Sequence, residues 1–159
     1  MISEIDMKHL RRSVELAKEA LEKGDQPFGS VLVSKDGEVL FEDHNHIAGG
    51  DYTQHPEFNI ARWAGQNLSE SVRAETTVYT SGEHCPMCSA AHGMAGLGRI
   101  VYVSSSKQFS EWKEEFGVEE TPRINGFSIK EMIVDAKVVG PVPELAAEVK
   151  ELHRQYFGK

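Results

Sequence analysis

The sequence predicts an α/β protein in which a central five-stranded mixed sheet lies between two layers of helices, a three-layer α/β/α arrangement. Helical and strand-like patterns alternate along the chain, and an Asp-Gly turn joins two short apolar runs near its start. The 159 residues contain no internal repeat and no linker-like stretch. With 40% hydrophobic and 26% charged residues, the composition predicts a single globular domain over residues 1–159.

The N-terminal half begins with a helix and a hairpin. Apolar residues recur at helical spacing over residues 5–21, and the pattern stops at a glycine, which predicts the first helix. Two short apolar runs, 30–34 and 38–42, flank the Asp-Gly turn and therefore predict a β-hairpin. After a polar loop, a proline suited to a first helical turn opens a helix predicted over residues 56–66.

Strands and helices alternate in the C-terminal half. A buried strand is predicted over residues 76–80, and the turn after it leads into a helix that begins near Cys85. The next strand is predicted over residues 99–104. The remaining elements are a short helix, a strand and a closing amphipathic helix, predicted over residues 110–116, 129–139 and 144–157.

Charge and cysteine content exclude several classes of protein. No stretch approaches the roughly 20 apolar residues of a membrane span, and the polar N-terminus is unlike a leader peptide, so we expect a cytoplasmic protein with no membrane partner. A net charge of −8 with dispersed Lys and Arg argues against a nucleic-acid partner. Only Cys85 and Cys88 are present, three positions apart, which predicts a reducing compartment rather than a disulfide framework.

The informative residues are His55 and Glu57, followed downstream by Cys85 and Cys88, because each pair stands where a helix is predicted to begin. Positions i and i+3 share a helix face, so both sulfurs can point at one atom. A helix N-terminus carries partial positive charge, which favours thiolates and hence metal binding. One imidazole and two thiolates make three zinc ligands and leave the fourth tetrahedral position for water, as in a catalytic zinc site.

The alternatives to a catalytic zinc site are weaker. A C-x-x-C motif by itself fits half of a zinc ribbon or a redox pair equally well. The chain has no second C-x-x-C, which excludes a closed four-cysteine zinc site within one chain. Glu57, two residues after the His ligand, can reach the water without joining the metal. It therefore fits a proton shuttle between the attacking water and a departing amine.

The motifs His55-Pro56-Glu57 and Cys85-Pro86-Met87-Cys88 resemble the H-x-E and P-C-x-x-C motifs of the cytidine deaminase-like superfamily. Within it the chain looks most like the small guanine deaminases, with tRNA adenosine deaminases and fungal-type cytosine deaminases as neighbours. The resemblance implies a cytidine deaminase-like fold, Zn²⁺ held by His55, Cys85 and Cys88, and Glu57 as general acid/base. It also implies Asn45 as an amide that reads the base and Phe28 as an apolar wall.

Two departures from the family pattern bear on the substrate. His84 stands where the family usually has Pro, and it is either a further donor in the pocket or a surface residue. Residues 107–110 offer no Asp where guanine-type enzymes carry an acid. His92 follows Cys88 by four positions, so it either touches substrate or is a core histidine with a hydrogen-bond partner. The other four histidines are predicted at the surface without a role: His9, His44, His46 and His153.

The predicted function is hydrolytic deamination of a small aminated heterocycle by a zinc-bound hydroxide, with release of ammonia. The substrate ranked first is a free base such as guanine. The alternatives are a tRNA adenosine deaminase, or a deaminase of cytosine, a pterin or a triazine. Family resemblance also implies a homodimer, whose interface is expected near four apolar residues, Leu97, Trp112, Phe116 and Phe157.

Overall fold

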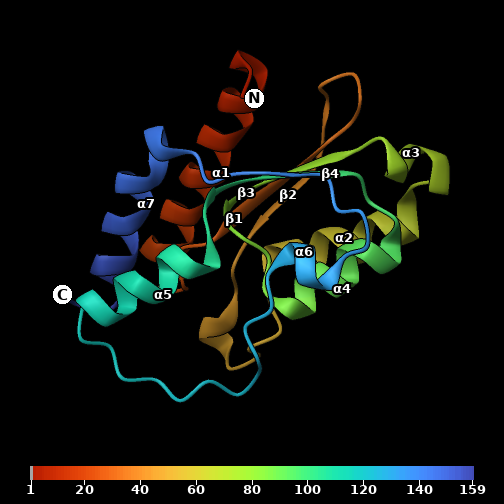
Figure 1. The fold of residues 1–159 in the computed structure, drawn as a ribbon. Helices are drawn as coiled ribbons and strands as arrows, with labels where there is room; N and C mark the ends of the chain where they lie inside the picture. Colours follow the sequence, from red (N-terminus) through yellow and green to blue (C-terminus); the bar gives the residue numbers. More distant parts are fainter. Residues whose placement is uncertain (1) are drawn as a thin grey trace.

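In the computed structural model, which describes residues 2–159, five strands form one sheet with helices on both of its faces (Figure 1). The three-layer α/β/α fold expected from the sequence is thus confirmed. The helices are α1 (Glu4–Glu22), η1 (Ile47–Gly49), α2 (Pro56–Asn67), α3 (Glu70–Ala74), α4 (Pro86–Ala95), α5 (Ser106–Glu115), α6 (Ile129–Met132) and α7 (Pro143–Tyr156). The strands are β1 (Gly29–Val33), β2 (Val39–His44), β3 (Thr77–Gly82), β4 (Arg99–Ser104) and β5 (Val138–Val139).

The sheet is mixed, with the strand order β2-β1-β3-β4-β5. Strand β1 runs antiparallel to both β2 and β3, whereas β3, β4 and β5 are parallel to one another. Parallel neighbours require a crossover, and α4 provides the one between β3 and β4. The carboxyl ends of β3 and β4 therefore lie side by side, which is where open α/β sheets bind their ligands.

Each face of the sheet has its own apolar core. Val31 and Val33 point to the face covered by α1 and α7, where Leu10 and Val149 are fully buried. Leu32, between them in β1, points to the opposite face and packs with Ile60 of α2. Figure 1 shows α1 and α7 on one side of the sheet and α2 and α4 on the other.

A partly buried ion pair between Asp6 and Arg99 fixes α1 against the sheet. Asp6 caps the helix start through Ser3 and is only 5% exposed. Its carboxylate accepts hydrogen bonds from both terminal nitrogens of Arg99, at 2.9 and 3.0 Å, and from the Tyr79 hydroxyl at 2.7 Å. The Arg99 guanidinium holds the pKa of Asp6 well below its ordinary value. The charged form of Asp6 is therefore the one that stabilises the fold.

The prediction of a strand over residues 129–139 is wrong for most of that range. Residues 129–132 form α6, and only Val138 and Val139 pair with β4. The helix start is set by a capping box, in which Ser128 accepts from the Glu131 backbone and Glu131 accepts from the Ser128 backbone. A second capping box, between Ser105 and Gln108, makes α5 begin four residues earlier than predicted.

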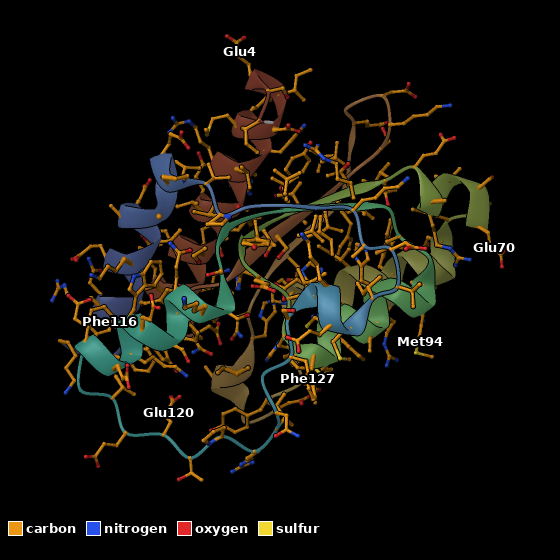
Figure 2. All side chains as sticks on the ribbon, viewed as in Figure 1. Glu4, Glu70, Met94, Phe116, Glu120 and Phe127 are labelled. Atoms are coloured by element: carbon orange, nitrogen blue, oxygen red, sulfur yellow. The ribbon has the colours of Figure 1, made fainter. Side chains whose placement is uncertain are left out.

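Some of the apolar residues expected near a dimer interface pack inside the chain instead. Trp112 is 9% exposed within the α1–α7 core, and Phe116 and Leu97 pack against the two cores. Met94 is 89% exposed and, with Phe127, lies on the α4–α6 side of the molecule (Figure 2). The homodimer stays a prediction that light scattering would check. No helix within residues 2–159 is long and apolar enough to cross a membrane.

Candidate metal centre and active site

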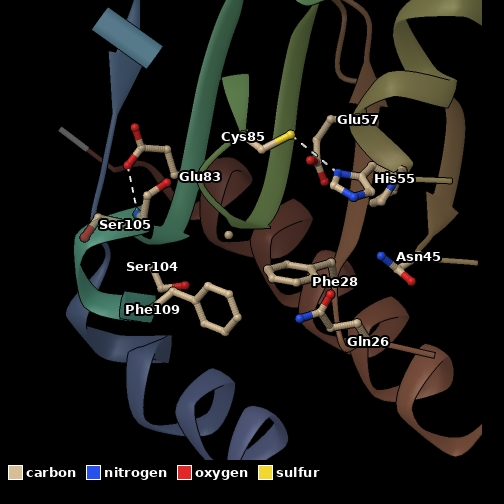
Figure 3. A pocket seen from close by; sticks show the side chains of 13 residues that line it. Gln26, Phe28, Asn45, His55, Glu57, Glu83, Cys85, Ser104, Ser105 and Phe109 are labelled. Atoms are coloured by element: carbon tan, nitrogen blue, oxygen red, sulfur yellow. Dashed lines mark hydrogen bonds between the residues drawn. The ribbon is translucent and has the colours of Figure 1, made fainter. Parts of the chain in front are cut away.

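Three metal-binding side chains meet where two helices begin on the same side of the sheet. His55 is the residue before α2, Cys85 is the residue before α4, and Cys88 lies in the first turn of α4. A proline follows His55 and Cys85 at the first helical position of each helix. The Nδ1 atom of His55 and the two sulfurs are each 3.5 Å from the other two atoms. Figure 3 shows His55 and Cys85 facing each other across the top of a cavity.

This triangle has the size that zinc requires. Zn–S bonds of about 2.3 Å and Zn–N bonds of about 2.0 Å in a tetrahedron place neighbouring ligand atoms about 3.5–3.8 Å apart. The observed 3.5 Å separations fit that geometry without rearrangement of the chain. The donor set of one imidazole and two thiols also suits zinc, and it leaves a fourth position free for a non-protein ligand.

Local charge favours a thiolate at this place. Hydrogen bonding from the Cys88 thiol and from His55 lowers the pKa of Cys85 to about 4. The pKa of Cys88 is raised, because its thiol is hydrogen-bonded to Cys85 and because burial disfavours its charged form. Negative charge is therefore favoured at Cys85, and a cation between the two sulfurs would make a second thiolate at Cys88 less costly.

Glu57 lies beside the triangle and is 6% exposed. The Ser30 hydroxyl donates a hydrogen bond to Oε1 of Glu57 at 2.9 Å and contacts the Thr80 hydroxyl at 2.8 Å. Burial raises the pKa of Glu57 to about 7. The carboxyl group is thus held in a fixed orientation by two strands of the sheet, next to the residues that could hold a metal.

A cavity of about 170 Å³ opens below His55, Glu57 and Cys85. Phe28 and Phe109 form its apolar side, with their rings in edge-to-face contact at 5.5 Å. Phe28 fits because residue 82 is glycine: a Cβ there would lie 2.8 Å from the Phe28 ring. The polar lining consists of Gln26, Asn45, Glu83, Ser104, Ser105 and Ser106 (Figure 3). A flat ring with polar edges matches this combination.

Asn45 points into the cavity, and the oxygen of its side-chain amide already accepts a hydrogen bond. Its Oδ1 accepts a hydrogen bond from the Ile47 backbone at 2.9 Å, and the residue is 1% exposed. Among the described residues none is paired with its Nδ2. The amide is therefore presented to the cavity as a hydrogen-bond donor.

His84 and His92 lie outside this cavity. His84 is fully buried, which excludes a surface position, and its ring packs edge-on against His92 at 5.3 Å. Burial lowers the pKa of His84 well below its ordinary value. His92 contacts the Gly98 carbonyl through Nε2 at 2.7 Å, as a core histidine with a partner does. The prediction of surface positions is wrong for His9, His44 and His153, which are buried.

Several lining residues were not predicted from the sequence: Gln26, Glu83, Ser104, Ser105, Ser106 and Phe109. Four of them lie at the end of β4 or the start of α5. The signal that could have found them is the Ser105–Gln108 capping box directly after a buried strand, because ligands bind at the carboxyl ends of parallel strands.

A second group of potential ligands, Asp25, His44 and His46, lies on the loop side of β2. His44 contacts the Asn45 carbonyl through Nδ1 at 2.8 Å, and Lys23 Nζ lies 3.3 Å from its Nε2. The Nε2 atom of His44 is therefore already in contact with the side-chain nitrogen of Lys23, at the position that a metal ion would take. This group therefore fits a metal less well than the His55–Cys85–Cys88 triangle.

Comparison with known proteins agrees with this geometry. The chain is 28% identical over 116 residues to a probable cytosine deaminase of Schizosaccharomyces pombe, covering 73% of this chain and 70% of that one. It is 27% identical over 117 residues to a tRNA-specific adenosine deaminase of Aquifex aeolicus, covering 73% and 77% of the two chains. The crystal structure of a guanine deaminase from Bacillus subtilis superposes with a TM-score of 0.58 at 29% identity, covering 79% of this chain and 87% of that one.

The sequence profile of one family extends over residues 3–104, which include the whole triangle and Glu57. That family is described as the cytidine and deoxycytidylate deaminase zinc-binding region. The fold, the three converging ligand-type side chains and the adjacent carboxyl group all accord with it. The chain therefore belongs to the cytidine and deoxycytidylate deaminase zinc-binding family.

Proposed function

We propose that this protein is a hydrolytic deaminase of a small aminated heterocycle, with a free base such as guanine as the first candidate. The observation that carries the proposal is the buried Glu57 carboxyl group beside three zinc-ligand side chains, at the end of a cavity with an apolar side and a polar lining. His55, Cys85 and Cys88 would hold the metal. When bound there, zinc supplies the acidity that makes water a nucleophile at neutral pH.

Glu57 would carry the protons of the reaction. The oxygen of water forms a bond to the ring carbon, and the bond from that carbon to its exocyclic nitrogen breaks. A Glu57 carboxylate oxygen accepts the proton that water loses and delivers it to the departing nitrogen, which leaves as ammonia. Ser30 holds Oε1 during this transfer, so the carboxyl group does not swing away from the ring. Thr80, in contact with Ser30, supports that hydroxyl in turn.

The remaining lining residues would orient the ring. Phe28 and Phe109 offer it an apolar surface, and Nδ2 of Asn45 would donate to an acceptor on its edge. Guanine, cytosine, pterins and triazines all carry such acceptors. The similarity to guanine and cytosine deaminases supports a free base, and the net charge of −8 argues against a nucleic-acid substrate.

A tRNA adenosine deaminase is the second candidate. It is favoured by the Aquifex aeolicus relative and by a larger chamber of about 760 Å³ outside the inner cavity. The two cavities share Gln26 and His55, and Lys113 and Arg123 border the outer one. A ring attached to a longer molecule could therefore reach the inner cavity.

The test is ammonia release by the zinc-loaded protein from guanine, cytosine, cytidine, adenosine, a 2-aminopterin, a triazine amine and a tRNA anticodon stem-loop. Glu57→Gln protein is the blank, since it keeps the ligands and loses the proton carrier. We expect the highest kcat/KM with a free base, guanine first. A highest value with cytidine, adenosine or the RNA would overturn the free-base proposal. If cytosine, the pterin or the triazine exceeds guanine, the deaminase proposal stands and the ranking is wrong.

A further inference from the structure

Glu83 lies between α4, the metal-ligand helix that begins after Cys85, and the opposite wall of the cavity. It follows the last residue of β3 and precedes Cys85 by two positions. Its backbone N–H donates to the Ser104 carbonyl at 2.8 Å, which extends the pairing of β3 and β4 by one more step. The Glu83 backbone is therefore fixed by the sheet, and its side chain borders the cavity (Figure 3).

The two carboxylate oxygens of Glu83 bind two different helix starts. Oε1 accepts from the backbone N–H of Ser106 at 3.0 Å, and Oε2 accepts from that of Ile129 at 3.0 Å. Ser106 is the first residue of α5 and Ile129 is the first residue of α6. Both contacts join segments that are far apart in the sequence.

These two contacts add to the capping of both helices. In each capping box the serine accepts the N–H of the third helical residue, and the side chain of that third residue accepts the N–H of the serine. The capping box leaves the N–H groups of the first and second helical residues without an acceptor, and in both helices Glu83 accepts the first of them. The negative charge also lies at the positive end of α5.

The start of α5 is one wall of the cavity. Ser105, Ser106 and Phe109 all border it, and Phe109 contacts Phe28 on its apolar side. The segment between α5 and α6, residues 116–128, borders the outer chamber through residues such as Glu120 and Arg123. In Figure 1 this segment runs along the bottom of the molecule from α5 to α6. Glu83 thus binds the first residue of each of the two helices that this segment connects.

We propose that Glu83 is a positioning residue for the proposed deamination: it holds the α5 wall and the start of α6 at a fixed distance from the metal-ligand helix. This role rests on the proposed function, because it is the ring of the substrate that the wall would hold. Glutamine at this position would offer one carbonyl oxygen and turn an N–H₂ group toward the other backbone N–H. One of the two contacts would then be lost.

Amide hydrogen exchange followed by NMR measures the two contacts without any need for a substrate. In Glu83→Gln protein, the backbone amide of either Ser106 or Ile129 should exchange about tenfold faster than in the wild type. In Glu83→Ala protein, both amides should exchange faster, because each amide loses a hydrogen bond to a charged acceptor. Exchange in α1 and the zinc content should not change. Glu111→Gln is the matched control, since Glu111 is an exposed residue of α5 that pairs with Lys107.

Kinetics with the best substrate of the panel then tests the consequence. We expect KM to rise about tenfold in Glu83→Gln protein and kcat to change less, because Glu57 and the metal ligands stay in place. Unchanged exchange at both Ser106 and Ile129 would overturn the proposal. Faster exchange with unchanged KM would also overturn it, since the wall would then not position the ring. Unchanged exchange with a higher KM would assign Glu83 to direct substrate contact instead. A panel without any substrate would refute the proposed function, while the exchange result would still report on the two contacts.

Discussion

Ser30 in β1 donates a hydrogen bond to Glu57 in α2 at 2.9 Å, so the carboxyl group proposed to carry the protons is oriented by a strand of the central sheet. Both residues are buried, and the hydrogen bond favours this one orientation of the carboxyl group. The sheet therefore does more than support the site. It fixes the direction in which the carboxyl group faces.

Replacing this hydroxyl should slow turnover while leaving the metal site intact. In Ser30→Ala protein we expect kcat to fall about tenfold with little change in KM, because a hydrogen bond to a charged group is lost. Zinc content measured by elemental analysis should stay at the wild-type level. Ser13→Ala is the control: Ser13 is equally buried, but its hydroxyl donates to the Leu10 carbonyl within α1. A wild-type kcat in Ser30→Ala protein would show that Glu57 needs no such support.

Glu57 itself should be required for chemistry and not for metal binding. Glu57→Gln protein should keep its zinc and its thermal stability, whereas kcat should fall by about 100-fold or more as the proton carrier is lost. Metal analysis and ammonia release on the same sample separate the two effects. Near-normal turnover would refute the proposed mechanism, and loss of zinc would mean that Glu57 is a ligand.

Metal stoichiometry should identify the His55–Cys85–Cys88 triangle as the zinc site. The wild type should hold about one zinc per chain, because the three side chains form one site. Cys85→Ala protein should lose both zinc and activity. His46→Ala protein should keep both, since Lys23 already lies against His44 in the second group. Two zinc ions per wild-type chain, or one lost in His46→Ala protein, would contradict this assignment.

The sequence was sufficient to select His55, Cys85 and Cys88 as candidate ligands because the geometry within each motif is local. His55 and Glu57 are two residues apart, Cys85 and Cys88 share the first turn of one helix, and each pair begins a helix with a proline. Helical periodicity then places both sulfurs on one side. The same reasoning cannot place Phe109, because its position depends on how β4 enters α5 and on where Glu83 holds that helix.

Errors in the sequence-based fold have equally specific causes. Ile129, Met132 and Ile133 lie in a segment as apolar as a strand, and periodicity cannot separate a short helix from a short strand. Ser128 and Glu131 decide the matter through their capping box. His153 was expected at the surface because its helix is amphipathic, yet it packs against Phe28 and Phe109 on the buried side.

The Asp6 ion pair should make stability depend on pH. The native pKa of Asp6 lies below its value in the unfolded chain, so its contribution is fully present above about pH 5 and is lost as the pH falls toward the native pKa. Asp6→Asn protein should be less stable than the wild type by about 2 kcal/mol or more in urea unfolding at pH 7. The difference should shrink as the pH is lowered from about 5 to about 2. Glu151→Gln, at an exposed ion pair with Arg154, should leave stability unchanged.

Gly82 should control the width of the cavity. A Cβ at this position would lie 2.8 Å from Cε1 and 3.1 Å from Cδ1 of Phe28. The Phe28 ring also packs against Phe109 and His153, with ring centroids 5.5 and 4.9 Å apart. In Gly82→Ala protein the ring must therefore shift within an already filled space, and the apolar side of the cavity changes shape.

A flat two-ring substrate needs more of that surface than a single ring does. We expect kcat/KM for guanine to fall about tenfold in Gly82→Ala protein, with a smaller decrease for cytosine, because overpacking typically costs about 1–3 kcal/mol. Zinc content should be unchanged. Gly93→Ala in α4 is the matched control, since a Cβ there meets Ile133 at an ordinary 3.6 Å. Unchanged kcat/KM values for both bases would show that Phe28 does not contact the ring, and the apolar wall of the cavity would then be Phe109 alone.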